Sequence, residues 1–328
     1  MSVEVTSRPS RIANFPSDRL FVVVSRVLAL VLLVAALSYL SPYFLTWPNF
    51  SNILRQASLQ FMISAGLTIV ILTAGIDLSV GAVLGLAACI AASLMSEGHV
   101  VFGIGLALVA AIACGLANGM LVTLARIPPF IATYGMLWIA FGLGYVFMKG
   151  EVIYGLPSGF RVIGAGFLWG IPVPVIIAAI MLGGLHLLLH TTVLGRAIYA
   201  IGGNPVAARL SGMPVTKYLI IVYTLSGFLA GFAALVTIAR INSADSGIGE
   251  DLLLPALAAV CLGGTSLFGG VGGVAGTAVG TIIMALIING MNLLGVQSFW
   301  QATVTGSIIL LAVIADQLGG KRHARHAA

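Results

Sequence analysis

Long apolar stretches, separated by short polar ones, follow one another from about residue 21 to residue 317. Each is close to the ~20 residues that an α-helix needs to cross the roughly 30 Å hydrocarbon layer of a bilayer. The stretches are continuous rather than alternating, which argues against transmembrane β-strands of about 10 residues. The pattern predicts about ten membrane-spanning helices, at approximately 21–40, 57–75, 78–96, 100–125, 130–148, 172–190, 218–239, 252–268, 274–294 and 300–317.

The composition supports an all-α polytopic membrane protein. Of the 328 residues, 60% are hydrophobic and 7% charged, and the mean hydropathy is +1.13, whereas soluble proteins have about 45–50% apolar and about 25% charged residues. There is no room for a soluble domain of useful size. We expect a cytoplasmic N-terminal segment at 1–20, a membrane bundle at 21–317 and a basic cytoplasmic tail at 318–328. The first stretch follows a basic segment, as in a signal peptide, but its length and the lack of a small-residue cleavage motif predict a retained span.

The cations predict the orientation, because short cytoplasmic loops carry the excess of Lys and Arg. If the N-terminus is inside, the outer side receives only Arg55, Lys149, Arg161 and Arg240, and Arg26 lies in the first span. Both termini are therefore expected in the cytoplasm, and the net charge of +6 is a membrane signal rather than evidence for a nucleic-acid partner. The inner side receives Arg8, Arg11, Arg19, Arg126, Arg196, Arg209, Lys217, Lys321, Arg322 and Arg325.

The polar interval 191–217 interrupts the second half of the chain on the predicted cytoplasmic side and contains the run GRAIYAIGGNPVAARLSGMPVTK. Within it, Asn204 suits an N-cap, Pro205 suits the first helical position and Gly212 suits a C-terminal stop. Pro214 prevents continuation. These signals predict a short helix of about two turns.

The predicted short helix has an apolar face. Val206 and Leu210 are four residues apart and share that face, Met213 extends it, and Arg209 points elsewhere. A capped amphipathic helix near the membrane is a shape that a partner's groove can bind. The alternative is a solvated loop with an incidental helix.

Asp77 is an acidic residue at the start of a predicted span, where charge is costly at membrane depth. The sequence G-I-D-L-S favours a cap on the third span, whose dipole attracts an anion. A gating or conformational role is the second reading. Proton coupling, the third, has little support from a lone acid.

The translocation pathway is weakly marked. A neutral polar solute needs hydrogen-bond partners, and the polar groups nearest the spans are Asn118, Asn289, Asn292 and Gln297. Asn289 and Asn292 are three apart and share a helical face. Hydrogen bonds between helices explain these residues equally well.

Glycines spaced by four, as in Gly115/Gly119 and Gly227/Gly231, predict close helix packing, with broken helices around a pathway as the alternative. The likeness of 75–81 to 264–270 falls at non-equivalent helices and is treated as local.

The chain offers few groups for catalysis or metal binding. His186 and His190, one turn apart at a helix end, fit an interfacial cap better than a ligand pair. Cys89, Cys114 and Cys261 lie in apolar stretches without paired spacing and are expected to be small buried residues. We predict no metal site, and no nucleophile and base pair emerges at a spacing typical of an enzyme.

Four runs together resemble the permease subunit of bacterial ribose-type ABC importers. They are TAGIDLSVGA (73–82), GRAIYAIGGNPVAARLSGM (195–213), ALAAVCLGGTSLFGG (256–270) and NGMNLLGV (289–296). The similarity extends, in order, from about residue 50 to 316.

The resemblance implies a ten-helix subunit that pairs with a second permease, usually an identical copy and otherwise a related one. A periplasmic or surface sugar-binding protein delivers substrate, and a separate cytoplasmic ATP-binding subunit binds ATP-Mg and drives the cycle. The interval 191–217 then couples to that subunit. The family's Gly-Asn pattern matches Gly203, Asn204, Ala208, Arg209 and Gly212.

The residues agree with this division of labour. No run reads G-x-x-x-x-G-K-[ST], and GGTSLFGG has the glycines but no lysine, so this chain is expected to carry no cofactor and no ATPase of its own. The outer segments 149–171 and 240–251 carry mixed charges that suit docking of the binding protein, although ordinary exposed loops explain them as well. These charges are Glu151, Arg161, Asp245, Glu250 and Asp251.

Other functions stay open. No residue here argues against an ABC importer permease that carries branched amino acids, an autoinducer or a nucleoside. A secondary transporter is a weaker alternative because it needs coupling carboxylates or cation sites within the spans.

Overall fold

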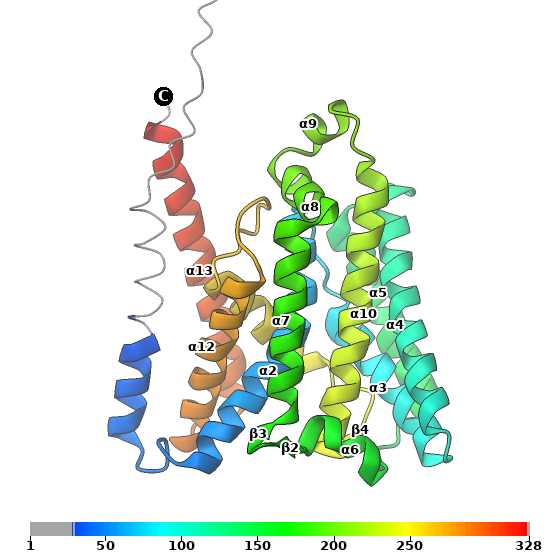
Figure 1. The fold of residues 1–328 in the computed structure, drawn as a ribbon, viewed down its shortest axis with the longest axis vertical. Helices are drawn as coiled ribbons and strands as arrows, with labels where there is room; N and C mark the ends of the chain where they lie inside the picture. The colour runs from blue at the N-terminus through cyan, green and yellow to red at the C-terminus, as the bar shows by residue number, and fades with distance from the viewer. Residues whose placement is uncertain (1–27, 29, 327–328) are drawn as a thin grey trace, which may run out of the picture.

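A computed structural model describes residue 28 and residues 30–326, with side chains through residue 314. The predicted segment 1–20 lies outside this part of the chain. The described residues form a bundle of helices with only two-residue strands (Figure 1). The helices are Leu30–Leu40, α2 (Trp47–Leu72), α3 (Val80–Ser96), α4 (Val100–Thr123), α5 (Pro129–Met148), α6 (Ser158–Ala165), α7 (Val173–Thr191), α8 (Val193–Gly203), α9 (Pro205–Leu210), α10 (Val215–Ile241), α11 (Leu253–Leu262), α12 (Val274–Leu293) and α13 (Phe299–His326), with the 3-10 turn η1 (Glu250–Leu252) before α11.

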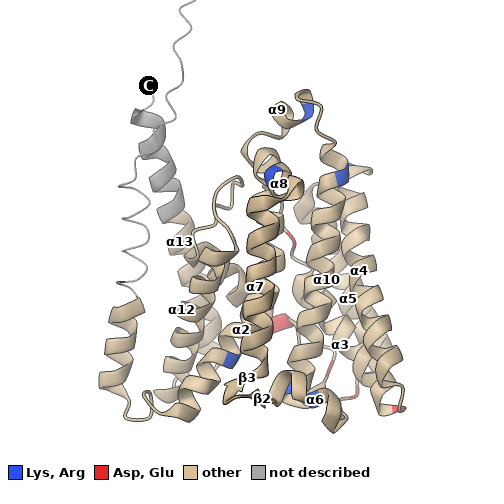
Figure 2. Cartoon of the chain, viewed as in Figure 1, with Lys and Arg blue, Asp and Glu red and all other residues tan. Residues whose placement is uncertain are grey.

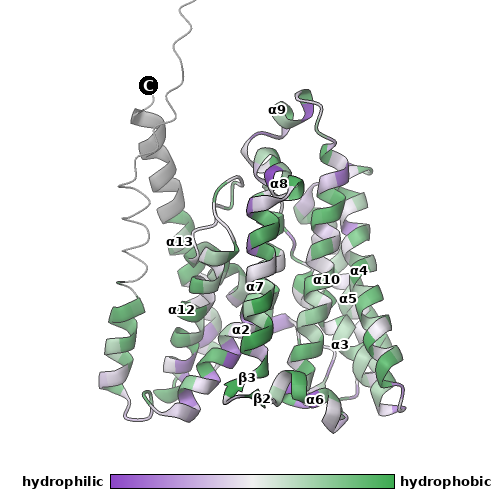
Figure 3. Ribbon diagram, viewed as in Figure 1, coloured by the Kyte–Doolittle hydropathy of each residue, from purple (hydrophilic) through white to green (hydrophobic). Residues whose placement is uncertain are grey.

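Two ends of the bundle can be distinguished. At one end, the α9 end, lie α8, α9 and the C-terminal end of α13 (Figure 1). At the other, the α6 end, lie α6 and two short antiparallel pairs: β1 (Ile153–Tyr154) with β4 (Ser243–Ala244), and β2 (Phe167–Leu168) with β3 (Ile171–Pro172). Hydrophobic residues predominate along the sides of the helices between these ends, as a surface embedded in lipid requires (Figure 3).

Among the described residues, six helices are long and apolar enough to cross a membrane: α2, α4, α5, α7, α10 and α12. The predicted first span, 21–40, lies partly outside the described residues, and its described helix is Leu30–Leu40. Most of the other predicted spans coincide with a helix, and three differ. The second begins at Trp47 rather than 57, because the polar N-terminal turns of α2 continue the helix. The predicted span 252–268 is shorter, since α11 ends at Leu262 and is followed by a glycine-rich turn with Gly264 at φ +71°. The last continues through His326.

The core is built around α10, which packs against α2, α3, α4 and α6. The predicted close approach is confirmed where α10 meets α4. A Cβ on Gly115 would lie 2.3 Å from the Tyr223 carbonyl oxygen, and one on Gly227 would lie 2.3 Å from the Ala111 carbonyl oxygen. Only glycine permits the two backbones to touch at these points.

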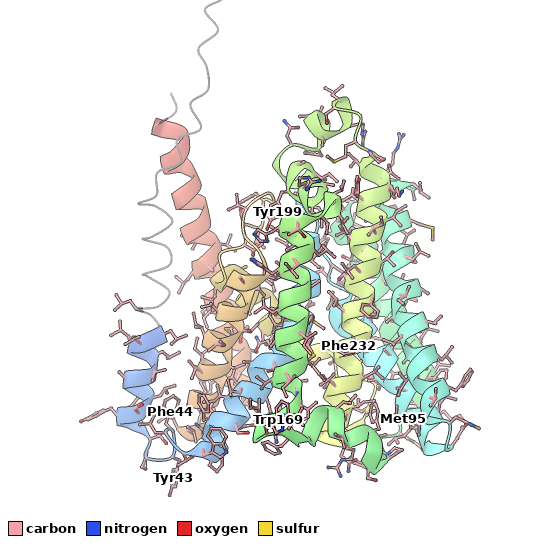
Figure 4. All side chains as sticks on the ribbon, in the orientation of Figure 1. Tyr43, Phe44, Met95, Trp169, Tyr199 and Phe232 are labelled. Atoms are coloured by element: carbon pink, nitrogen blue, oxygen red, sulfur yellow. The ribbon has the colours of Figure 1, made fainter. Side chains whose placement is uncertain are left out.

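The segment 242–252 re-enters the bundle instead of staying at the α6 end. The Cys89 thiol of α3 donates to the Asp245 carbonyl oxygen at 3.5 Å, and deeper in, a Cβ on Gly81 would lie 2.5 Å from the Gly249 carbonyl oxygen. Gly81 is the second residue of α3, whose opposite end is marked by Met95 at the α6 end (Figure 4). This corrects the prediction that 240–251 is an outer docking loop: glycine-to-glycine contact draws Glu250 deep along α3.

Candidate functional site

The short helix α9 has the predicted cap. The Asn204 side-chain oxygen accepts the backbone N–H groups of Val206 and Ala207, each at 3.0 Å, and Pro205 occupies the first helical position. Gly212 has φ +82°, a left-handed conformation that favours glycine, and it ends the turn after the helix. The local sequence therefore fixes both ends of α9.

The helix α9 presents an apolar face outward. Val206 is 66% exposed and Leu210 84% exposed, while Ala208 is buried against Ile201 and Val215. Arg209 is exposed as well. Met213 does not extend the exposed face, as the sequence suggested, because it packs into this small cluster. The arrangement is a protruding knob whose base is anchored and whose apolar side is free (Figure 1).

The base of the knob contacts two places where a helix ends or begins inside the bundle: the end of α2 and the turn before α12. A Cβ on Gly202, at the end of α8, would lie 1.8 Å from the Leu72 carbonyl oxygen. The same carbonyl accepts the Gly270 N–H at 2.9 Å, and Gly269 lies against Ala74. We call this meeting of the end of α2, the end of α8 and the turn at 269–270 the glycine junction.

Tyr199 of α8 ties the turn before α12 to the same place. Its hydroxyl donates to the Gly272 carbonyl oxygen at 2.9 Å, and it lies near the α9 end of the bundle (Figure 4). Burial raises the pKa of Tyr199 above its ordinary value, so the hydroxyl keeps its proton at neutral pH and remains a donor.

Immediately beyond the junction, residues 73–79 connect α2 to α3 through a buried polar network centred on Asp77. One carboxylate oxygen of Asp77 accepts the Ser79 N–H at 3.0 Å and the Ser79 hydroxyl at 2.6 Å. The other accepts the Ser226 hydroxyl of α10 at 2.9 Å, and Asp77 is only 2% exposed. The N-cap of α3 is Ser79. Asp77, two residues before it, still accepts a backbone N–H at the start of α3, and it also ties the α2–α3 connection to α10.

Neighbouring helices complete the network. The Asn118 side-chain amide of α4 donates to the Ser79 hydroxyl at 2.8 Å. The Ile76 carbonyl accepts the Tyr223 hydroxyl at 3.4 Å and the Thr133 hydroxyl at 3.3 Å. The α2–α3 connection is thus held by α4, α5 and α10 together.

The four asparagine and glutamine residues predicted near the pathway have different surroundings. Asn118 belongs to the Asp77 network. Asn289 is buried and exchanges side-chain hydrogen bonds with Asn49 of α2, at 2.7 and 3.2 Å. Asn292 is exposed and accepts from Gln301 at 2.8 Å. Gln297 is exposed in the turn between α12 and α13. For Asn289, the alternative prediction of a hydrogen bond between helices is what the structure has.

The two histidines of α7 stack at 4.1 Å between ring centroids, and a ring nitrogen of His190 lies 2.9 Å from the His186 carbonyl oxygen. In the described part of the chain, no group of three or more His, Cys, Asp or Glu residues could hold a metal ion. Acidic residues are sparse, and they are not confined to the two ends of the bundle (Figure 2).

An aromatic stripe on α5 was not among the features predicted from the sequence, although its spacing is visible there. Phe130, Tyr134, Trp138 and Phe141 recur every three or four residues, and each ring lies 6.0–6.5 Å from the next, measured between centroids. Tyr134 is 46% exposed and Trp138 is 61% exposed. Helical spacing of aromatic residues would have identified this stripe.

A bundle of long apolar helices with interrupted helices inside it is an architecture typical of membrane transport components. Residues 49–314 match the family described as the branched-chain amino acid transport system permease component. The chain belongs to this family.

Curated relatives extend the match over nearly the full length. The ribose import permease of Bacillus subtilis is 43% identical over 88% of this chain and 91% of its own. The ribose import permease of Escherichia coli K12 is 43% identical over 88% and 92%. The galactose/methyl galactoside import permease of Salmonella typhimurium is 37% identical over the same shares. No solved structure matches significantly.

Proposed function

We propose that this chain is the membrane-spanning permease subunit of an ATP-driven, binding-protein-dependent importer of a monosaccharide such as ribose. The observation that carries the proposal is the 43% identity to ribose import permeases over 88% of the chain. The match to a galactose/methyl galactoside permease supports a sugar more broadly. The family's description favours branched-chain amino acids as the second substrate class.

In this proposal the chain crosses the bacterial inner membrane about ten times, with both termini and the α9 end in the cytoplasm. The chain itself hydrolyses no ATP. Two copies, identical or closely related, enclose the path. A cytoplasmic ATP-binding subunit holds ATP-Mg and grips the exposed face of α9, where Val206, Leu210 and Arg209 are free to contact it.

The sugar-binding protein is proposed to dock at the α6 end. Three arginines gather there: Arg55 lies over the Phe167 ring at 4.3 Å, Arg240 donates to the Asn52 side chain at 2.9 Å, and Arg161 lies on α6. A basic rim suits a partner with acidic contacts. Glu250 and Asp251 do not belong to this rim, given their depth along α3.

Motion of α9 is proposed to reach the membrane interior through the glycine junction. A rigid, capped α9 moves with α8, whose Gly202 rests on the Leu72 carbonyl. The next residues lead to Asp77, which is tied to α10 through Ser226. A displacement at the knob therefore shifts the α2–α3 connection against α10.

The test uses the reconstituted complex of permease, ATPase and binding protein. Arg209→Ala and Leu210→Ser should abolish ATP hydrolysis stimulated by the sugar-loaded binding protein while leaving purified permease stable, because both side chains are exposed. Leu124→Ser, which is 64% exposed at the end of α4, is the matched control and should retain stimulation. Full stimulation in both α9 variants would refute the coupling role.

A further inference from the structure

A cavity of about 320 Å³ lies between α3, α5 and the re-entrant segment, within the size range of ligand sites. Its walls include Gly81 of α3, Tyr134, Trp138 and Phe141 of α5, and Gly249 and Glu250 at the start of η1. The cavity is open on one side. It joins an aromatic wall to a single carboxylate.

The cavity lies deep in the bundle. Gly81 is fifteen residues before Ser96, the last residue of α3, which corresponds to about 22 Å along the helix from the α6 end. Gly249 contacts Gly81, so Glu250 lies at a similar depth. Asp251 follows it, and both side chains are exposed. Carboxylates facing lipid at such depth are strongly disfavoured, and acidic groups there mark water-filled pathways.

The aromatic wall has a geometry suited to flat apolar surfaces. The Tyr134 and Trp138 rings are 6.3 Å apart between centroids at an interplanar angle of 86°, and Phe141 lies 6.5 Å beyond. Phe141 is buried, whereas Trp138 is 61% exposed. The Glu250 carboxylate accepts no hydrogen bond from the described residues. An exposed ring and a free acceptor therefore border the same space.

We propose that this cavity is a transient binding site for a neutral monosaccharide on its way through the permease, with Trp138 and Tyr134 against the C–H face of the sugar ring and Glu250 accepting hydrogen bonds from its hydroxyls. The proposal rests on the proposed function and names the site that function requires. A monosaccharide has both faces that the cavity matches: apolar C–H groups that pack on aromatic rings and hydroxyl donors that a carboxylate binds strongly.

The first experiment measures labelled ribose and galactose uptake, together with ATP hydrolysis, in proteoliposomes that contain the whole importer. Trp138→Ala should lower uptake about two- to tenfold, and Glu250→Gln should lower it about tenfold. Hydrolysis stimulated by the binding protein should stay within about twofold of the wild type, because neither residue lies in α8, α9 or the junction. Trp300→Ala on α13, also exposed at 53% but outside the cavity, should change neither quantity.

The outcomes separate the two proposals. If the wild-type importer takes up neither sugar, the proposed function fails. If it does, and both Trp138→Ala and Glu250→Gln transport at the wild-type rate, the cavity assignment is overturned. Should Trp138→Ala fail to assemble, Glu250→Gln, which preserves the side-chain volume, decides the matter: uptake at the wild-type rate overturns the cavity assignment.

A second measurement tests whether the cavity faces water. In a variant whose Cys89, Cys114 and Cys261 are replaced by alanine, Tyr134→Cys should react with a charged thiol reagent at least about tenfold faster than Leu310→Cys, an exposed residue of α13, because the reagent does not enter hydrocarbon. Equal, slow labelling at both positions would place this face of α5 in lipid and overturn the inference.

Discussion

The helices α10 and α5 are both apolar and long enough to cross a membrane, yet they have opposite surroundings. In the most apolar window of α10, 61% of residues are buried, compared with 28% in α5. Gly227 and Gly231 of α10 press against α4, whereas Gly135 and Gly142 of α5 have no atom within 4 Å of a potential Cβ. Glycine thus permits close helix contact in α10, whereas in α5 it lies on an open face. The α10 region is therefore a tightly packed interior, whereas α5 presents an exposed aromatic face.

The largest effect is expected where α10 touches α4. Gly227→Val places a side chain against the Ala111 carbonyl and should destabilise the permease by more than about 3 kcal/mol, so that little folded protein remains. Thermal unfolding of the purified protein in detergent measures this. Gly142→Val on α5 is the matched control and should change the stability by no more than about 1 kcal/mol. Equal losses in both variants would remove the contrast between the two helices.

The next effect concerns the tie between α10 and the α2–α3 connection. Asp77→Leu leaves two buried hydroxyls and one backbone N–H without their acceptor and should cost about 3 kcal/mol. Asp77→Asn keeps an oxygen for Ser79 and an amide that donates to Ser226, so it should retain much of the transport. Uptake and thermal stability are the readouts. Complete and equal loss of proton-sensitive transport in both variants would favour a coupling acid instead.

A smaller effect is expected at the glycine junction. Gly202→Ala forces the Leu72 carbonyl away and should cost about 2 kcal/mol. It should also lower sugar uptake for each ATP hydrolysed, since the knob would no longer rest on α2. Gly183→Ala on α7, whose added Cβ would have no atom within 4 Å, is the control and should behave as the wild type. Wild-type coupling in Gly202→Ala would show that motion takes another route.

The smallest effect on stability belongs to the α9 cap. Asn204→Ala removes the acceptor of two backbone N–H groups and should cost about 1 kcal/mol, confined to α9. Hydrogen exchange of the α9 amides should rise while that of the α10 core does not. Asn204→Asp retains the cap and should restore protection. Unchanged exchange in Asn204→Ala would mean that packing of Ala208 alone holds the helix.

Features fixed by local chemistry were predictable from the sequence. The cap, the proline and the terminal glycine of α9 are neighbours in the chain, so its bounds followed directly. The small-residue contacts of Gly115 and Gly227 were expected as a type of packing. The partner of each glycine was not, because it depends on which helices meet.

Features that depend on tertiary contacts were not predictable. Residues 242–252 have the polarity of an outer loop, and only the contact of Gly249 with Gly81 draws them inward. The contact of Asp77 with the start of α3 could be expected from the sequence, but the hydrogen bond from Ser226 of the distant helix α10 to the other carboxylate oxygen could not. The aromatic spacing of α5 was visible in the sequence, while its pairing with Glu250 was not.

In the proposed function, this bundle has no energy source of its own and is driven through α9 by a separate ATPase. The most direct measurement is sugar accumulation in proteoliposomes that contain the permease alone, under imposed proton and sodium gradients, beside vesicles with the complete importer and ATP. We expect uphill accumulation only in the complete system. Uphill accumulation by the permease alone would contradict it.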